Sequence, residues 1–366
     1  MKTLFIISTG MDKKPDAEIK RLEESDLLPR VSLLEEKINA TVLDERLLSQ
    51  APWYRKWLYK ILPGFVCQII EAFFIHKKYD VILSFYEKTA LPFALLQKIT
   101  ASPVPHVFMS SWLSSKEKAF FLKQVHRKLT KIILWSTVQK NVAVERIGIP
   151  ESKIKLVNYA VDQNFWRPVD AEMDIISSAG MEMRDYPTLI EAVRPLNIPV
   201  HIATGATRGA LFDTVKKLYQ IDDLPAHVHV EKKSFPDLRA LYARSRFVVI
   251  PLLPTDTDNG ITVMLEAMAM GKTVICSKVE GQTDVLQDGI TGIFVPQGDP
   301  VALREAIEEL WNSPGRCKIM GDAARGYLLE HHSFEQFIDN IAQEVIAMGR
   351  VPEPYMQSKT MEEVLI

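Results

Sequence analysis

Short apolar runs alternate with longer helical-type segments through the first part of the chain. Apolar runs of this length, bounded by polar residues, are typical of buried β-strands. A helical stretch ends near Lys37, and we predict strands at Leu4–Ser8, Ala40–Asp44, Val81–Phe85, His106–Met109 and Lys131–Ser136. The alternation predicts a parallel sheet flanked by helices. Ligands of such sheets bind beyond the carboxyl ends of the strands, here near Thr9, Gly10, Tyr86 and Ser110 to Trp112.

The second part of the chain repeats the pattern, with strands predicted at Met173–Ala179 and Phe247–Pro251 and mainly helices after residue 300. Its most regular unit lies between residues 262 and 276. Thr262–Met270 consists of good helix formers without internal Gly or Pro, Gly271 provides a left-handed stop, and Thr273–Cys276 is a short β-branched run. This pattern predicts a helix, a tight turn and a buried strand.

One carboxylate, Glu266, interrupts the apolar side chains of this predicted helix. A buried carboxylate without partners costs several kcal/mol, so we expect Glu266 to receive hydrogen bonds, for example from a ligand hydroxyl. A second acid, Asp258, precedes the helix by a few residues. Asn259 and Gly260 leave backbone N–H groups free at the positive end of the helix, which suits an anionic or hydroxyl-rich ligand.

Glu266 follows Asp258 by eight positions, and the predicted helix begins between them. This pair of acids resembles the paired-acid signature of retaining GT-B glycosyltransferases, in particular family 4. The segment 280–299, which contains Asp288-Gly-Ile-Thr-Gly292 and ends in Val295-Pro-Gln-Gly-Asp299, is similar to the same family at nearly every key position. Asp162 and Pro168 match the segment that leaves the first domain, where Tyr159 and Ala160 replace the more usual Asn-Gly. The segment from His332 to Glu335 resembles the motif before the closing helix.

The resemblance implies a fold of two Rossmann-like domains that face each other across a cleft. The acceptor-side domain would span residues 1–168 and the nucleotide-sugar domain 169–340, with a linker around 165–173. Residues 341–366 would form a helix and tail that return toward the first domain. In the family the second acid binds the ribose hydroxyls and the first acid binds hydroxyls of the donor sugar, roles that fall by position on Glu266 and Asp258.

The family holds the donor diphosphate with two cations after the first strand of the second domain. Arg184 falls at one of these positions, whereas Met181 occupies the other, so Arg208 is the candidate substitute; a surface salt bridge remains the alternative for each arginine. By the same resemblance, the catalytic set is Asp258, Glu266 and Arg184. The remaining donor-binding positions are Gly180, Arg208, Lys232, Ser234, Phe235, Asn259, Gly260, Ile261 and Thr262.

The acceptor side departs further from the family. Gly10 stands alone where relatives often have two glycines, and Ser110, Ser111 and Trp112 follow a strand where many relatives have a histidine. The reading requires no metal and no cofactor beyond a UDP- or GDP-linked co-substrate. The Asp256-Thr-Asp258 sequence imitates the metal motif of another glycosyltransferase fold, but its flanking residues belong to the GT-B pattern.

Composition narrows the class of protein. A chain of 366 residues that is 47% hydrophobic can bury two cores, since about 150 residues is the usual domain size. A net charge of −2 argues against nucleic-acid binding. The three scattered cysteines show no metal spacing and indicate a reducing compartment. The short apolar start is followed at once by Asp12, Lys13 and Lys14, which favours a first strand over a signal peptide.

Two segments mix aromatic and basic residues, residues 53–78 and 112–131. Such mixtures occur at membrane interfaces, although an ordinary solvated face over a normal core remains an equal alternative. The expected location is cytoplasmic, peripheral on the inner face of a membrane. The leading hypothesis is a retaining hexosyltransferase in polysaccharide biosynthesis that acts on a lipid-linked or polysaccharide-precursor acceptor. A nucleotide-sugar-binding protein without turnover and another GT-B enzyme, such as an epimerase, are the alternatives.

Overall fold

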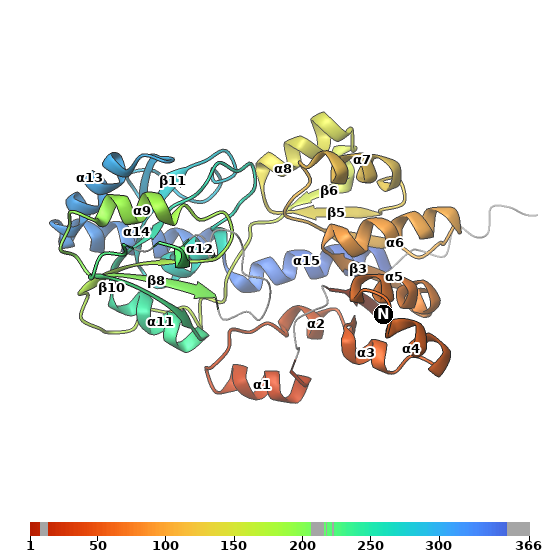
Figure 1. Ribbon diagram of the computed structural model, residues 1–366. Coiled ribbons are helices and arrows are strands. Elements are labelled where there is room, and N and C mark those ends of the chain that lie inside the picture. The colour runs from red at the N-terminus through yellow and green to blue at the C-terminus, as the bar shows by residue number, and fades with distance from the viewer. Residues whose placement is uncertain (8–13, 206–215, 217, 222, 350–366) are drawn as a thin grey trace, which may run out of the picture.

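The computed structural model describes residues 1–7, 14–205, 216, 218–221 and 223–349, which form two lobes side by side (Figure 1). Each lobe contains one parallel sheet with helices packed against its faces. The strands within the described residues form two sheets of six, which confirms the predicted α/β architecture. None of the described helices is long and apolar enough to cross a membrane.

The first sheet has the strand order β2-β1-β3-β4-β5-β6, and all of its pairings are parallel. Its order reverses between β1 and β3. A reversal of this kind opens a crevice at the carboxyl ends of the two strands. The strands are β1 (Thr3–Ile6), β2 (Ala40–Leu43), β3 (Val81–Phe85), β4 (His106–Met109), β5 (Lys131–Leu134) and β6 (Ile154–Leu156).

Capping side chains begin several helices of the first lobe. Asp44 accepts hydrogen bonds from the amides of Arg46 and Leu47, and Ser115 and Ser136 accept one each at the starts of α7 and α8. A π-helical turn, Val142–Ile147, follows α8, and 3-10 turns lie at His76–Lys78 and Glu151–Lys153. The helices are α1 (Asp16–Glu24), α2 (Leu33–Lys37), α3 (Glu45–Ser49), α4 (Trp53–Tyr59), α5 (Gly64–Ile75), α6 (Glu87–Ile99), α7 (Lys116–Val125) and α8 (Thr137–Asn141).

The second sheet has the order β12-β11-β10-β7-β8-β9, which reverses between β7 and β10. This is the order of a dinucleotide-binding Rossmann sheet. Its strands are β7 (Ile175–Ala179), β8 (Val200–Gly205), β9 (Val228–Lys233), β10 (Ser245–Ile250), β11 (Thr273–Lys278) and β12 (Gly292–Pro296). Its helices are α9 (Tyr186–Val193), α11 (Phe235–Arg244), α12 (Ile261–Ala269), α13 (Pro300–Trp311) and α14 (Pro314–His331).

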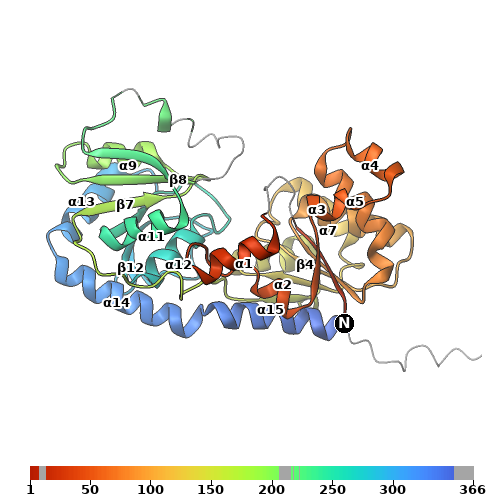
Figure 2. The ribbon, with the colours of Figure 1, turned by 90° about the horizontal axis from the view of Figure 1, so that it is seen from below.

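The last described helix, α15 (Phe334–Gly349), belongs to the core of the first lobe although it follows α14 of the second. Figure 2 shows α14 and α15 running one after the other beneath both lobes. Phe337, Ile338 and Ile341 pack with Val81 and Leu83 of β3 in one buried cluster. The apolar face of α15 therefore attaches the end of the chain to the lobe in which the chain begins.

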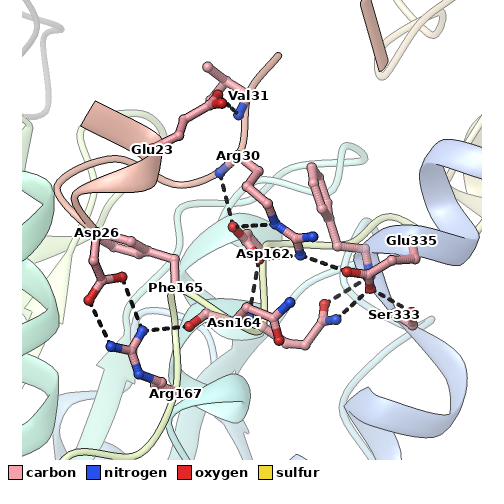
Figure 3. Close-up of polar contacts among 12 residues, drawn as sticks. Glu23, Asp26, Arg30, Val31, Asp162, Asn164, Phe165, Arg167, Ser333 and Glu335 are labelled. Atoms are coloured by element: carbon pink, nitrogen blue, oxygen red, sulfur yellow. Dashed lines mark hydrogen bonds and ion pairs between the residues drawn. The ribbon is translucent and has the colours of Figure 1, made fainter. Parts of the chain in front are cut away.

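Ion pairs hold the linker and the start of α15 near this crossing (Figure 3), and one further pair reaches α11 of the second lobe. The Asp26 carboxylate, just after α1, accepts from Arg167 of the linker at 2.7 Å and from Arg239 of α11 at 2.9 Å. Both guanidinium groups lower the pKa of Asp26. Arg30 in turn binds Asp162 at 2.7 Å and Glu335 at 2.6 Å. A segment of the first lobe thus fixes the linker and α11 of the second.

The predicted strands agree with the structure to within a few residues, and four strands were missed. The strand predicted at Lys131–Ser136 ends at Leu134, which leaves Trp135 beyond the sheet, and the predicted helix 262–270 spans Ile261–Ala269. Gly271 has φ +70° as the stop requires. The missed strands are β6, β8, β9 and β12, which are short or follow segments without clear periodicity. Residues 350–366 lie outside the described part.

Candidate functional site

A cavity of about 460 Å³ lies between the two lobes at the carboxyl ends of both sheets. The first lobe contributes mainly aromatic side chains to its lining, and the second contributes a turn after β7 and the start of α12. Its first-lobe residues are Phe85, Tyr86, Ser111, Trp135 and Tyr159. Its second-lobe residues are Gly180, Met181, Glu182, Arg184 and the run from Asp258 to Val263.

Arg184 lies at the reversal point of the second sheet, where a bridge to Leu252 links it to the segment after β10. Its side chain is only 4% exposed. The Nε atom donates to the carbonyl of Ala179 at 2.9 Å, and Nη1 donates to the carbonyl of Glu182 at 2.9 Å. These bonds hold the guanidinium in one orientation beside the cavity.

Gly180 makes room for this guanidinium, and Gly260 makes room for Ile250 beside it. Gly180 has φ +113°, and a Cβ added there would lie 2.3 Å from Nη2 of Arg184. Gly260 has φ +95°, and its added Cβ would lie 3.7 Å from Nη1 of Arg184 and 2.9 Å from Ile250. A larger residue at Gly180 would displace the arginine and strain the backbone at the same time.

The charge of Arg184 has no carboxylate within ion-pair distance among the described residues. A buried cation without a counter-ion is costly, and an anion in the adjoining cavity would offset that cost. The cavity also contains the amino end of α12, whose backbone amides carry partial positive charge. The geometry suits a phosphate group at this place.

Glu266 of α12 is 5% exposed and lies behind the cavity wall formed by Thr262 and Val263. Burial raises its pKa to about 8, while a hydrogen bond from Tyr242 and the charge of Arg184 act in the opposite direction. The Tyr242 hydroxyl donates to Oε2 at 3.0 Å. The sequence required a partner for this carboxylate and suggested a ligand hydroxyl, but the fold itself supplies one from α11.

Asp258 lies in the loop before α12, and its Oδ2 atom is buried without a hydrogen-bond partner among the described residues. Burial raises the pKa of Asp258 to about 6, and a side-chain hydrogen bond with Trp135 of the first lobe lowers it. An unpaired buried oxygen costs about 1–3 kcal/mol, which a ligand hydroxyl would recover. Asp258 therefore lines the cavity with an acceptor oxygen that no donor among the described residues satisfies.

The loop that carries Asp258 is braced from several sides. Gln282 Nε2 donates to the carbonyls of Asp258 and Asn259 at 2.9 and 2.8 Å. Gly281 donates to the carbonyl of Thr255 at 3.1 Å, and a Cβ at Gly281 would lie 1.8 Å from the Thr257 carbonyl oxygen. Gln139 of the first lobe donates to the carbonyl of Asp256 at 2.7 Å. The loop is thus fixed before any ligand arrives.

A second cavity of about 480 Å³ adjoins the first and shares Glu182 and Asn259 with it. Trp112 of the first lobe forms one side, and Asp256 and Glu280 add two further carboxylates on the other. This cavity combines an aromatic ring with acidic side chains, a composition that disfavours anionic ligands. No group of three or more His, Cys, Asp or Glu side chains suited to a metal occurs in the described part of the chain.

The structure brings most of the predicted donor residues to the cavity, namely Gly180, Arg184, Asp258, Asn259, Gly260, Ile261 and Thr262. Four others that the structure describes are elsewhere. Glu266 lies behind Thr262 and Val263 and is not among the residues that line the cavity. Lys232 is exposed, Ser234 caps α11 by accepting from the amide of Asp237, and Phe235 packs edge-on against Phe165 and Trp166. None of these three is among the residues that line the cavity. Arg208 and Gly10 lie outside the described residues.

On the acceptor side the three predicted residues diverge. Ser111 lines the first cavity and Trp112 the second, whereas Ser110 is buried and donates from Oγ to Glu87. Sequence reasoning missed Trp135, which lies one residue beyond a strand end, and Glu182. The position of Trp135 after β5 was the available signal, because carboxyl ends of parallel strands share one edge.

Comparison with known proteins agrees with this geometry. Residues 180–313 match the family model described as glycosyl transferases group 1. An uncharacterised glycosyltransferase of Methanocaldococcus jannaschii is 22% identical over 57% of this chain and 57% of its own length. The mouse alpha-1,3/1,6-mannosyltransferase ALG2 is 31% identical over 37% of this chain and 32% of its own length. The chain thus spans about half of these curated relatives, or less.

Among solved structures, Anabaena HepE in complex with UDP superposes with a TM-score of 0.69 at 18% identity, covering 95% of this chain and 100% of the other. That likeness extends over both lobes and concerns the fold. The protein therefore has the two-domain GT-B fold, and its residues 180–313 match the model of group 1 glycosyl transferases.

Proposed function

We propose that this protein transfers a hexose from a UDP- or GDP-linked donor to an acceptor hydroxyl, with retention of the anomeric configuration. The observation that carries the proposal is the buried, unpaired guanidinium of Arg184 beside the amino end of α12, at the reversal point of the second sheet. A nucleotide diphosphate is the anion that this kind of sheet accommodates there.

The phosphates would lie between Arg184 and the amides at the start of α12. Two N–H groups of Arg184 already bind backbone carbonyls, so ordering of this side chain costs no entropy when the sugar nucleotide binds. Each charge-assisted bond to a phosphate oxygen contributes about 1.5–3 kcal/mol. The same groups stabilise the negative charge that develops on the leaving phosphate during transfer.

Asp258 would then bind a hydroxyl of the donor hexose, because its Oδ2 atom is unpaired among the described residues. Glu266 is held by Tyr242 and does not line the cavity, so the ribose contact that the family resemblance implies would require its side chain to turn toward the cavity when the donor binds. Because the pKa of Asp258 is about 6, its carboxylate is largely ionised at neutral pH. The rigid loop around it would hold the sugar in one orientation.

Retention would follow a front-face route. The bond from the anomeric carbon to the phosphate oxygen breaks, the acceptor oxygen attacks from the same face, and the departing phosphate oxygen takes the acceptor proton. This route uses no protein nucleophile and places the demand on stabilising the leaving group, which is the role assigned to Arg184. Structural neighbours determined with UDP and with UDP-glucose support a nucleotide-sugar donor.

The proposal is tested by thermal-shift screening against UDP- and GDP-sugars, followed by measurement of slow UDP or GDP release from the sugar that binds. We expect one nucleotide class to stabilise the protein and to be released, and Arg184→Ala to abolish both effects. Lack of stabilisation by either class would refute the proposal.

A second candidate is a protein that binds nucleotide sugars without turnover. Met181 lines the cavity where the resembled family has a cation, and Glu182 adds a negative charge to the same wall. Together they weaken the stabilisation of a leaving phosphate. Stabilisation by a nucleotide sugar without any release or transfer, in the presence of a broad set of acceptors, would favour this candidate over the enzyme.

For the acceptor we propose a lipid-linked or polysaccharide-precursor glycan presented at a membrane surface. Trp53 and Trp57 of α4 are 82% and 67% exposed, and Lys56 and Lys60 lie beside them in the chain. Arg55 is not available for such contact, because it forms an ion pair with Glu71 at 2.8 Å. Exposed tryptophans with neighbouring lysines suit an anionic bilayer interface.

Flotation with anionic liposomes tests this attachment. The wild type should float, and a Trp53→Ser, Trp57→Ser double variant should remain in solution, because each exposed indole contributes apolar contact at the interface. A matched double variant at exposed apolar residues of the second lobe, Ile290→Ser and Ile319→Ser, should float as the wild type does. Equal behaviour of the two double variants would rule out attachment through α4.

A further inference from the structure

A third cavity, of about 540 Å³, lies on the first lobe between α6 and α7. Leu91 and Pro92 of α6 and Phe121 of α7 form its apolar surface, and charged side chains at the starts of both helices border it, namely Glu87, Lys88, Glu117 and Lys118. Phe121 remains 44% exposed. An open groove of this composition leaves apolar surface in contact with water unless a ligand covers it.

Tyr86 connects this groove to the cleft between the lobes, because it lines both cavities. It has φ +76°, a conformation that costs a bulky aromatic residue roughly 1–3 kcal/mol. Its ring packs at a tilt of 32° against the ring of Phe85, with centroids 4.1 Å apart. The strained backbone places the ring at the boundary between the polar cleft and the apolar groove, so a ligand in the groove would reach the cleft beside this residue.

The two lysines that line the groove differ in their ion pairing. Lys118 pairs with Glu87 at 3.1 Å and lies 3.8 Å from the centre of the Trp112 ring. Lys88 has no ion-pair partner in the described part of the chain, and its Nζ atom lies 4.3 Å from the centre of the Phe65 ring of α5. Lys88 is thus a cation on the α6 wall without a carboxylate partner among the described residues, whereas Glu117 lies on the α7 wall. A ligand with a hydrocarbon chain and an anionic head would therefore place its head at Lys88.

The surface beside the groove is also apolar. Phe120, the neighbour of Phe121 on α7, is 64% exposed, and Ile61, shortly before Phe65, is 67% exposed. The helices α5, α6 and α7 pack side by side, and each follows or precedes a strand of the same sheet. Phe120 and Ile61 are therefore apolar surface outside the groove itself.

We propose that the groove between α6 and α7 holds the hydrocarbon chain of a glycan acceptor linked to a lipid phosphate, with Lys88 contacting the phosphate and Tyr86 marking the passage into the cleft. This inference rests on the proposed function, since it assigns a site to the lipid part of the acceptor. The groove volume falls in the range of small-molecule sites, about 300–1,000 Å³, which suits a short stretch of a lipid chain.

The test uses the full chain and farnesyl phosphate, below the concentration at which it aggregates, in isothermal titration calorimetry. Saturable binding is expected. Phe121→Asp should weaken it about tenfold or more, the equivalent of roughly two buried methylene groups. Phe120→Asp is the matched control, because this neighbouring side chain lies on the same helix but does not line the groove, and it should change affinity by less than about twofold.

Two further probes separate the chain from the head group. Farnesol should bind through the groove and respond to Phe121→Asp but not to Lys88→Ala, whereas farnesyl phosphate should respond to both. Inorganic phosphate alone should not compete with farnesyl phosphate at equal concentration. Equal losses in Phe120→Asp and Phe121→Asp, or full competition by inorganic phosphate, would overturn the assignment.

UDP and GDP titrations of the same samples distinguish this inference from the proposed function. Nucleotide binding without farnesyl phosphate binding would refute the groove and leave the transferase proposal intact. The reverse result would retain the groove as a lipid site and refute the transferase proposal. Unchanged nucleotide affinity in Phe121→Asp would establish that the variant is folded.

Discussion

On the second-lobe side of the cleft, Arg184, Gly180 and the start of α12 present fixed charge and backbone, whereas the opposite side presents the rings of Tyr86 and Trp135. The first wall depends on atoms that fit within tenths of an ångström, such as the guanidinium packed over Gly180. The second consists of large side chains that many ligands can contact. The matched family model covers residues 180–313, which include the second-lobe wall of the cleft, and it does not cover the aromatic wall. We expect this if close packing limits which residues can be replaced on the second-lobe wall.

The largest effect should come from Arg184→Ala, which removes the buried cation on the second-lobe side of the cleft. We expect donor affinity to fall roughly 50–100-fold, because charged hydrogen bonds contribute about 1.5–3 kcal/mol each. Titration calorimetry with UDP and GDP measures the loss. The unliganded protein should also lose stability, because the carbonyls of Ala179 and Glu182 lose their donor, so affinities are compared at a temperature at which both proteins are folded. Arg184→Lys should recover only part of the affinity, because lysine lacks the fork.

Gly180→Ala should weaken donor binding about tenfold or more by displacing the same guanidinium. Its control is Gly289→Ala, which has φ +75° but no heavy atom within 4 Å of the added Cβ. Both variants carry the backbone penalty, so their melting temperatures should both fall. Nucleotide affinity that falls in Gly180→Ala but not in Gly289→Ala would show that the packed guanidinium limits the second-lobe side of the cleft. Equal nucleotide affinities in the two variants would contradict this.

Glu266→Gln should flatten the dependence of stability on pH. The folded-state pKa of Glu266 is raised from 4.5 to about 8, so the folded protein retains a proton that the unfolded chain releases. The free energy of unfolding of the wild type should therefore decrease as pH rises from 4.5 toward 8. Glutamine keeps the partner of Tyr242 without a charge. Chemical denaturation at several pH values measures the difference, and an identical slope in the two proteins would contradict it.

Trp135→Phe should have the smallest effect and concerns the contact between the two walls. Because Trp135 lowers the pKa of Asp258, its loss should raise that pKa above about 6. The acid limb of nucleotide release should then shift to higher pH, with a few-fold loss near pH 6 and little loss near pH 8. A uniform loss across the pH range would instead indicate a purely structural role.

The local sequence pattern predicted those elements whose conformation depends on residues close together in the chain. The run from Thr262 to Gly271 determined a helix and its stop, and the alternation of short apolar runs determined parallel sheets. It did not reveal β8, β9 or β12, whose residues depend on pairing with distant strands for their conformation. Nor did it reveal Trp135, which reaches Asp258 only across the cleft.

The sequence by itself determined that an acid in an apolar helix needs a partner, that an arginine follows a glycine turn, and which family these residues resemble. Only the tertiary structure decided that Tyr242 is the partner of Glu266, that Arg184 has no counter-ion among the described residues, and that Lys232, Ser234 and Phe235 do not line the cleft. The reason is physical. Burial, and the pairing of charges within it, depends on which distant segments pack together, and spacing along one chain does not specify that.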